Sequence, residues 1–230
     1  MRDYLATRDR VEEYFDSTAT TVWERLTSDA PVSGIRATVR AGRDEMRDLL
    51  LAQLPDDLRG KRILDAGCGT GAISVALAER GAEVTAVDIS PALIAIAQER
   101  VPRHLAGQIN WVAGDMRDAL TDVHDAMIAM DSLIYYRAED IAALLTDAKA
   151  RVDGPMIFTV APRTRMLMAM WRIGKLFPRS DRSPVMIPQT TAAIAHALRA
   201  QGARGHLREL KRVTSGFYIS QALSFRGGSA

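Results

Sequence analysis

The stretch that decides the fold of this chain is Ile63-Leu64-Asp65-Ala66-Gly67-Cys68-Gly69-Thr70-Gly71. Its apolar run predicts a buried strand, and the three alternate glycines after Asp65 predict a tight turn. Glycine lacks a Cβ and tolerates positive φ, so such a turn lets the backbone approach a ligand closely. A helix predicted after Gly71 adds free N–H groups at its first turn. The stretch is therefore typical of the nucleoside-binding edge of an α/β sheet.

Two further acidic residues stand at the ends of predicted strands. Asp88 follows the apolar strand 83–87, and Asp115 lies in the turn after a third short strand. The carboxyl ends of parallel strands meet at one edge of a sheet, where the ligands of open α/β folds bind. Asp65 is expected to face an ammonium group, Asp88 to accept hydrogen bonds from two ribose hydroxyls, and Asp115 to accept one from an adenine amino group.

The glycine spacing separates two kinds of nucleoside cofactor. A dinucleotide site has the pattern G-x-G-x-x-G and holds a pyrophosphate, whereas Gly67, Gly69 and Gly71 follow G-x-G-x-G without a basic residue. S-adenosylmethionine carries no phosphate, so it is the predicted cofactor, with S-adenosylhomocysteine as its product. Apolar residues after the strands complete the cofactor-binding candidates, the first two as flanks of the adenine ring: Ile89, Met116 and Met130. No residue is assigned to a metal.

Size and composition limit the classes of protein. A chain of 230 residues with 47% hydrophobic residues can bury a sizeable core. The net charge of +2 gives no global basic field, so nucleic acid is not expected as a partner. A single cysteine, Cys68, excludes an internal disulfide. The chain begins with polar residues and has no apolar run of about 18 residues, so we expect a cytoplasmic protein.

Strand and helix patterns alternate from residue 60 onward, as a doubly wound parallel sheet requires. Five strands are predicted near residues 62–66, 83–87, 109–112, 125–130 and 155–160. Helices are predicted near residues 72–80, 91–100, 138–151 and 190–201, and two antiparallel strands near 205–213 and 217–225. The pattern predicts a Rossmann-like α/β fold with a mostly parallel seven-stranded sheet whose last strand is antiparallel.

Two regions stand outside this alternation. Residues 1–59 carry helical apolar patterns and are predicted as an N-terminal cap on the cofactor-binding domain, residues 60–226. Residues 161–187 interrupt the domain with six basic residues, one acid and several methionines. This insertion is interpreted as a lid over a large apolar anion, with a membrane-surface helix and a solvated helix that packs one face as alternatives.

The predicted cap also contains a row of arginines. Arg36, Arg40, Arg43 and Arg47 share one face of a predicted helix. Arginine is the preferred side chain for binding carboxylates in a two-pronged way. Acidic residues are interleaved with the row, so an ion-paired surface is an equally open interpretation.

Four stretches resemble the magnesium-protoporphyrin IX methyltransferases of bacteriochlorophyll synthesis. They are the glycine turn 64–71, the segment Val87-Asp88-Ile89-Ser90, the N-terminal segment from Val11 to Thr18 with Trp23, and the block Asp131-Ser132-Leu133-Ile134-Tyr135-Tyr136. The glycine turn is common to class I methyltransferases and carries no substrate information. The N-terminal segment, the tyrosine block and the basic insertion are the features that point to the porphyrin enzymes.

The resemblance implies methyl transfer from S-adenosylmethionine to one propionate of magnesium protoporphyrin IX, which gives the monomethyl ester. It also implies the large subunit of magnesium chelatase as a partner, and the insertion adds a peripheral membrane contact as an alternative. Tyr14 and Tyr135 are the catalytic candidates, in an orienting role, and packing of an amphipathic helix is an equally open role for Tyr14. Relatives in oxygenic organisms often have His where this chain has Tyr135, so a duty of that imidazole does not carry over.

Three other functions remain open from the residues. A methyltransferase that acts on another small apolar acceptor, such as a phenol or quinol, needs a base, and Asp131 is then the candidate. A nicotinamide-binding module is disfavoured by the glycine spacing. A membrane-recruiting protein without catalysis would be built around the basic insertion.

Overall fold

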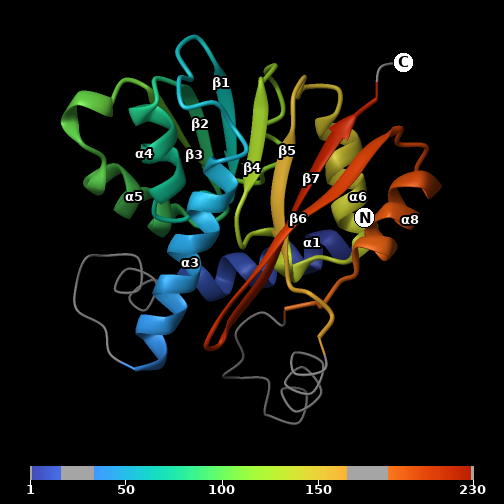
Figure 1. Cartoon of the computed structure of the whole chain (residues 1–230). Coiled ribbons are helices and arrows are strands. Elements are labelled where there is room, and N and C mark those ends of the chain that lie inside the picture. Colours follow the sequence, from blue (N-terminus) through green and yellow to red (C-terminus); the bar gives the residue numbers. More distant parts are fainter. Residues whose placement is uncertain (1, 17–33, 165–185, 229–230) are drawn as a thin grey trace.

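The computed structural model describes residues 2–16, 34–164 and 186–228, and these form one α/β unit (Figure 1). Its seven-stranded sheet has the order β3-β2-β1-β4-β5-β7-β6. The strands are β1 (Arg62–Ala66), β2 (Glu83–Asp88), β3 (Ile109–Ala113), β4 (Ala126–Ala129), β5 (Met156–Val160), β6 (Gly205–Ser215) and β7 (Tyr218–Gly227). Strands β1 to β5 are parallel, and β7 runs antiparallel to both β5 and β6. The predicted fold class is confirmed.

The strand order places a ligand crevice at the middle of the sheet. From β1 the chain moves outward through β2 and β3, then returns to the other side of β1 to form β4. The loops after β1 and β4 therefore leave the sheet in opposite directions, and a crevice opens between them.

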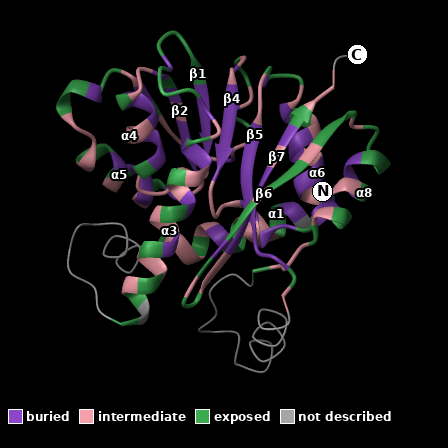
Figure 2. Cartoon of the chain, viewed as in Figure 1, coloured by how far each residue is buried: buried purple, intermediate pink, exposed green. Residues whose placement is uncertain are grey.

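Helices cover both faces of the sheet. They are α1 (Arg2–Tyr14), α3 (Ile35–Leu51), α4 (Ala72–Glu79), α5 (Pro91–Arg100), α6 (Ala138–Ala148) and α8 (Thr191–Ala200), with short 3-10 turns η2 (Arg103–Leu105) and η3 (Leu133–Tyr135). Neighbouring residues of β1 enter opposite cores: Ile63 packs with α3 and α4, and Leu64 packs with α1, α6 and α8. Burial on both faces explains why the central strands read as continuous apolar runs (Figure 2).

Local signals set several helix ends. Ser90 Oγ accepts a hydrogen bond from the Leu93 amide at 3.3 Å, and Pro91 follows at the first helical position of α5. Two predicted elements are shorter than expected: the helix near 138–151 ends at Ala148, and the strand near 125–130 covers only Ala126–Ala129. The strand ends early because Asp131 has a positive φ of 56° and turns the chain out of the sheet.

Residues 1–59 were predicted to be helical. The two helices that the structure describes in this range, α1 and α3, lie against the sheet. Helix α3 buries Met46 and Leu50, and its N-terminal half packs closely on the β6–β7 hairpin, where a Cβ at Gly42 would come within 2.7 Å of the Tyr218 ring. Helix α1 buries Tyr4 and Val11 in the opposite core. None of the helices in the described part of the chain is both long and apolar enough to span a bilayer.

Candidate active site

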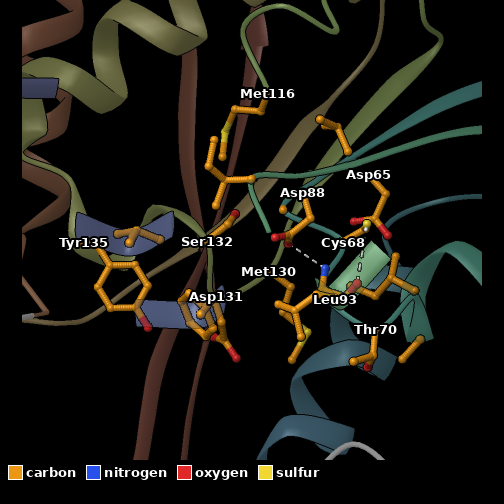
Figure 3. Close-up of a pocket in the computed structure, with 18 of the residues that line it drawn as sticks. Asp65, Cys68, Thr70, Asp88, Leu93, Met116, Met130, Asp131, Ser132 and Tyr135 are labelled. Atoms are coloured by element: carbon orange, nitrogen blue, oxygen red, sulfur yellow. Dashed lines mark hydrogen bonds between the residues drawn. The ribbon is translucent and has the colours of Figure 1, made fainter. Parts of the chain in front are cut away.

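A cavity of about 430 Å³ lies at the carboxyl ends of the central strands. Its walls come from the turns after β1, β2, β3 and β4 and from side chains of α1 and α3. Figure 3 shows side chains of the strand ends, among them Asp65, Asp88 and Asp131. The cavity brings together residues that are far apart in the sequence. The predicted candidates that line it are Asp65, Gly67, Gly69, Asp88, Ile89, Asp115, Met116, Met130 and Tyr135.

The glycine turn forms one wall, and its first and third glycines leave no room for a side chain. Gly67, Gly69 and Gly71 have φ values of 83°, 55° and 83°, which favour glycine. A Cβ at Gly67 would lie 2.2 Å from Ser132 Cβ, and one at Gly71 would lie 2.5 Å from the Trp111 ring. Gly71 is not among the lining residues. It is the N-cap of α4, so its conformation sets the end of the turn and the start of the helix.

The Asp88 carboxylate is held by the backbone of this turn. Oδ2 accepts a hydrogen bond from the Gly69 amide at 2.8 Å, and Oδ1 accepts one from the Ser90 amide at 3.0 Å. Burial raises the pKa of Asp88 above its usual value, although these backbone donors act in the opposite direction. Each oxygen keeps lone-pair capacity for a second donor, so the carboxylate is fixed as a two-sided acceptor.

Asp65 lies deeper, with 1% of its surface exposed. The Ser74 hydroxyl donates to its Oδ2 at 2.6 Å. Burial is the main cause that raises the pKa of Asp65 to about 7, and the nearby charge of Asp88 adds to it. A cationic group that entered the cavity beside Asp65 would favour its ionised form.

Helix α1 contacts Asp115, the third acidic residue. The sequence predicted Asp115 as a site residue but did not indicate this contact. The Tyr4 hydroxyl donates to Asp115 Oδ1 at 2.6 Å, and the Arg117 amide donates to the same oxygen at 2.9 Å. Arg8 lies 3.7 Å from Asp115 Oδ2, and the Tyr4 ring stacks on Tyr136 with 5.0 Å between centroids. These contacts attach the N-terminal helix to the end of β3.

The two tyrosine candidates lie at different depths. Tyr135 lines the cavity and packs edge-to-face on Phe15 at 6.3 Å between centroids. Tyr14 is not a lining residue, and its ring packs on Phe15 at 5.2 Å, one ring away from Tyr135. Burial raises the pKa of both hydroxyls, so both remain protonated donors near neutral pH.

The described ends of the insertion, residues 161–164 and 186–187, lie beside the part of the cavity wall that contains Tyr135 and Tyr136. The Ile187 amide donates to the Ile134 carbonyl at 2.8 Å, and the Gln189 amide donates to the Ala161 carbonyl at 2.8 Å. Gln189 Nε2 also donates to the Tyr136 carbonyl at 3.2 Å. The insertion, whose residues 165–185 lie outside the described part of the chain, therefore leaves and rejoins the fold next to cavity-lining tyrosines.

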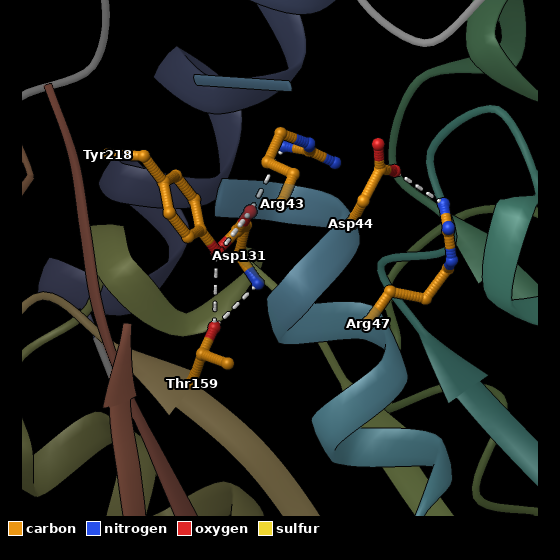
Figure 4. Close-up of polar contacts among 6 residues, drawn as sticks. All are labelled: Arg43, Asp44, Arg47, Asp131, Thr159 and Tyr218. Carbon is orange, nitrogen blue, oxygen red and sulfur yellow. Dashed lines mark hydrogen bonds and ion pairs between the residues drawn. The ribbon is translucent and has the colours of Figure 1, made fainter. Parts of the chain in front are cut away.

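Asp131 occupies the wall after β4, at the centre of a polar cluster (Figure 4). Arg43 Nη1 of α3 donates to its Oδ2 at 3.0 Å, and the Tyr218 hydroxyl of β7 donates to its Oδ1 at 3.0 Å. The Asp131 amide donates to Thr159 Oγ1 at 2.7 Å.

Within the ranges that the structure describes, no three His, Cys, Asp or Glu side chains gather as a metal site requires.

The strand order, the glycine turn and the acidic strand ends define a class I S-adenosylmethionine-dependent methyltransferase. A methyltransferase-domain family model matches residues 63–153. The model for the C-terminus of magnesium-protoporphyrin IX methyltransferase matches residues 129–226. The chain is 54% identical over 225 residues to the magnesium-protoporphyrin O-methyltransferase of Rhodobacter capsulatus, with 97% of this chain and 98% of that protein covered. It belongs to the magnesium-protoporphyrin IX methyltransferase family.

Solved structures of a relative agree with this assignment. The magnesium protoporphyrin IX methyltransferase of Synechocystis PCC 6803 with bound S-adenosylhomocysteine superposes with a TM-score of 0.76 at 30% identity, over 94% of this chain and 98% of that one. The same enzyme with bound S-adenosylmethionine gives 0.74 at 26% identity, over 96% and 97%. The predicted cofactor and family are confirmed, whereas the roles of single residues stay predictions.

Proposed function

We propose that this protein transfers the methyl group of S-adenosylmethionine to a propionate carboxylate of magnesium protoporphyrin IX, giving the monomethyl ester in bacteriochlorophyll biosynthesis. The observation that carries the proposal is the 54% identity, over nearly the full length of both chains, to an enzyme named for this reaction. The cavity between the cofactor edge of the sheet and the N-terminal helices is where donor and acceptor would meet.

The chemistry needs alignment and no proton transfer. A propionate has a pKa near 4–5, like Glu, and is ionised at neutral pH. One carboxylate oxygen attacks the sulfonium methyl, a C–O bond forms, and the electrons of the broken C–S bond return to sulfur. The products are the ester and S-adenosylhomocysteine. Because no proton is removed, the protonated state of Tyr14 and Tyr135 suits a role in orienting the acceptor.

The cofactor roles follow from the polar groups around the cavity. We assign the amino-acid ammonium group to Asp65, the ribose hydroxyls to Asp88 and the adenine amino group to Asp115. The two-sided acceptor geometry of Asp88 supports its assignment, since a second hydrogen bond fits each oxygen. Apolar contacts to the cofactor are assigned to Ile89, Met116 and Met130, and the turn at Gly67, Gly69 and Gly71 lies along its amino-acid part.

Exclusion of water is the second task of the protein. Residues 1–59 act as the cap, and the insertion 161–187 acts as a lid over the tetrapyrrole. Helix α1 supports the first assignment because it is attached to Asp115 through Tyr4. The hydrogen bond from Ile187, at the end of the insertion, to the Ile134 carbonyl beside Tyr135 supports the second. Good positioning of two reactants is worth roughly 7–11 kcal/mol of barrier.

Two further partners belong to the same proposal. The large subunit of magnesium chelatase would deliver the poorly soluble substrate. The basic and apolar residues between Arg163 and Arg182 in the sequence would add a peripheral membrane contact. Cosedimentation with anionic vesicles, with and without the purified large subunit, measures both contacts.

The decisive experiment is turnover with purified protein. Magnesium protoporphyrin IX and S-adenosylmethionine are mixed with the protein, and the ester is separated by chromatography. Appearance of the monomethyl ester supports the proposal. Methylation of a phenol or quinol, without ester formation on the porphyrin, would favour the alternative of another small apolar acceptor, with Asp131 as the base.

A further inference from the structure

Three arginines of helix α3 face the cavity. Arg40, Arg43 and Arg47 are among its lining residues, whereas Arg36 on the same helix is exposed and is not among them. The arginine row that the sequence left ambiguous therefore divides: one end of it faces solvent and the other faces the site. This places positive charge on the helical side of the cavity.

The opposite wall of the cavity is acidic. Asp65, Asp88 and Asp115 lie at the strand ends, where we place the cationic donor. The acceptor is a dicarboxylate, so these groups repel it at short range. Arginines on the facing wall supply the complementary charge, and their planar fork matches a carboxylate. The strand ends thus carry carboxylates for the donor, and helix α3 carries guanidinium groups that suit the acceptor.

Arg47 and Arg43 use their charge differently. Arg47 pairs within its own helix, with Asp44 at 2.9 Å and Asp48 at 3.7 Å. Arg43 instead reaches across to Asp131 Oδ2 at 3.0 Å, and 22% of its side chain is exposed (Figure 4). Arg43 therefore carries the positive charge of helix α3 to the wall after β4, close to the glycine turn.

The Asp131 side chain is fixed by groups from two other strands. Tyr218 of β7 donates to Oδ1 at 3.0 Å, and Thr159 Oγ1 of β5 donates to the same oxygen at 3.3 Å. Asp131 holds a φ of 56°, which costs a non-glycine residue energy and occurs preferentially at functional sites. Its neighbour Ser132 contacts Gly67, so the Arg43–Asp131 pair lies beside the predicted position of the methyl donor.

We propose that Arg43, oriented by Asp131 and Tyr218, binds the propionate carboxylate that receives the methyl group. The inference rests on the proposed function and adds the residue that selects the acceptor group. A guanidinium can serve two acceptors at once through its fork. The hydrogen bond to Asp131 fixes the orientation of the guanidinium, and this fixed orientation positions the carboxylate for attack.

The test compares three ligands that differ only in their carboxylates: magnesium protoporphyrin IX, its monomethyl ester and its dimethyl ester. Dissociation constants are measured by quenching of protein fluorescence in the presence of S-adenosylhomocysteine. We expect the wild-type protein to prefer the free acid to the monomethyl ester. In Arg43→Gln this preference falls roughly 10–100-fold, as expected for loss of a charge-assisted bidentate contact. Arg43→Lys keeps the charge and loses the planar fork, so its acid-to-ester preference is expected to lie between those of the wild type and Arg43→Gln.

Matched controls separate this role from general charge and from folding. Arg36→Gln removes the same charge from the same helix outside the cavity and is expected to keep the wild-type preference. Affinity for the dimethyl ester and for S-adenosylhomocysteine is expected to be unchanged in Arg43→Gln. Tyr218→Phe tests the positioning role. We expect it to reduce the acid-to-ester preference less than Arg43→Gln does. A hydroxyl with a merely structural role would leave this preference unchanged.

Two results would overturn the inference alone: an unchanged acid-to-ester preference in Arg43→Gln while the wild type makes the ester, or an equal loss of affinity for all three porphyrins. An equal effect of Arg36→Gln would also overturn it, since general surface charge would then explain the binding. Failure of the wild type to methylate the porphyrin, with cofactor binding intact, would instead overturn the proposed function and this inference with it.

Discussion

Acidification is expected to release the cofactor through Asp65. Its pKa of about 7 in the protein without ligand means that the side chain is half protonated near neutral pH. A protonated carboxyl cannot pair with the ammonium group of S-adenosylhomocysteine, so binding requires that the proton leaves. The pKa of Asp65 is thereby lowered in the complex, and affinity falls as the pH drops below about 7.

The magnitude follows from the ionised fraction. With a pKa of about 7, lowering the pH from about 7.5 to about 5.5 reduces the ionised fraction of Asp65 roughly 25-fold. The dissociation constant of S-adenosylhomocysteine should rise by the same factor over this range. Asp65→Asn keeps an oxygen that can accept from the Ser74 hydroxyl and has no proton to release. Its affinity is expected to be weak and nearly independent of pH.

Isothermal titration calorimetry in several buffers measures both the affinity and the proton released on binding. Methylthioadenosine serves as a matched ligand, because it keeps the adenosine and lacks the amino-acid part. Its affinity should change little with pH. A flat profile for S-adenosylhomocysteine in the wild type, or the same slope in Asp65→Asn, would refute the assignment of the ammonium group to Asp65.

Three substitutions extend the test to other parts of the site. Asp88→Ala should weaken S-adenosylhomocysteine binding by about 1.5–3 kcal/mol, the value of a charge-assisted hydrogen bond, and unchanged calorimetric affinity would contradict the ribose assignment. Tyr14→Phe should leave cofactor affinity intact and slow ester formation; equal turnover would remove its hydroxyl from the mechanism. Gly67→Ala should abolish cofactor binding and lower the melting temperature, because the added Cβ would lie 2.2 Å from that of Ser132. Near-normal binding by Gly67→Ala would show that the turn can relax.

Local patterns were sufficient for most of the fold. Strands β1 and β2 could be predicted because their apolar residues are neighbours in the sequence. The start of α5 at Ser90-Pro91 could be predicted because Ser90 caps the helix through Leu93, three residues further along the chain. The glycine turn is equally local, because its φ values are a property of the glycines themselves. The ends of β4 and α6 were less well predicted, since the turn at Asp131 depends on Thr159 in another strand.

The sequence by itself determined the alternating sheet, the turn that approaches the cofactor and the acidic residues at the strand ends, because each depends on chain neighbours and on parallel strands ending at one edge. Only the tertiary structure decided which side chains complete the site. Tyr4 meets Asp115 across 111 positions, Arg43 meets Asp131 across 88, and Tyr218 meets Asp131 across 87. Such contacts leave no periodic trace in the sequence, because they form only when helices α1 and α3 and the last strand pack against the folded sheet.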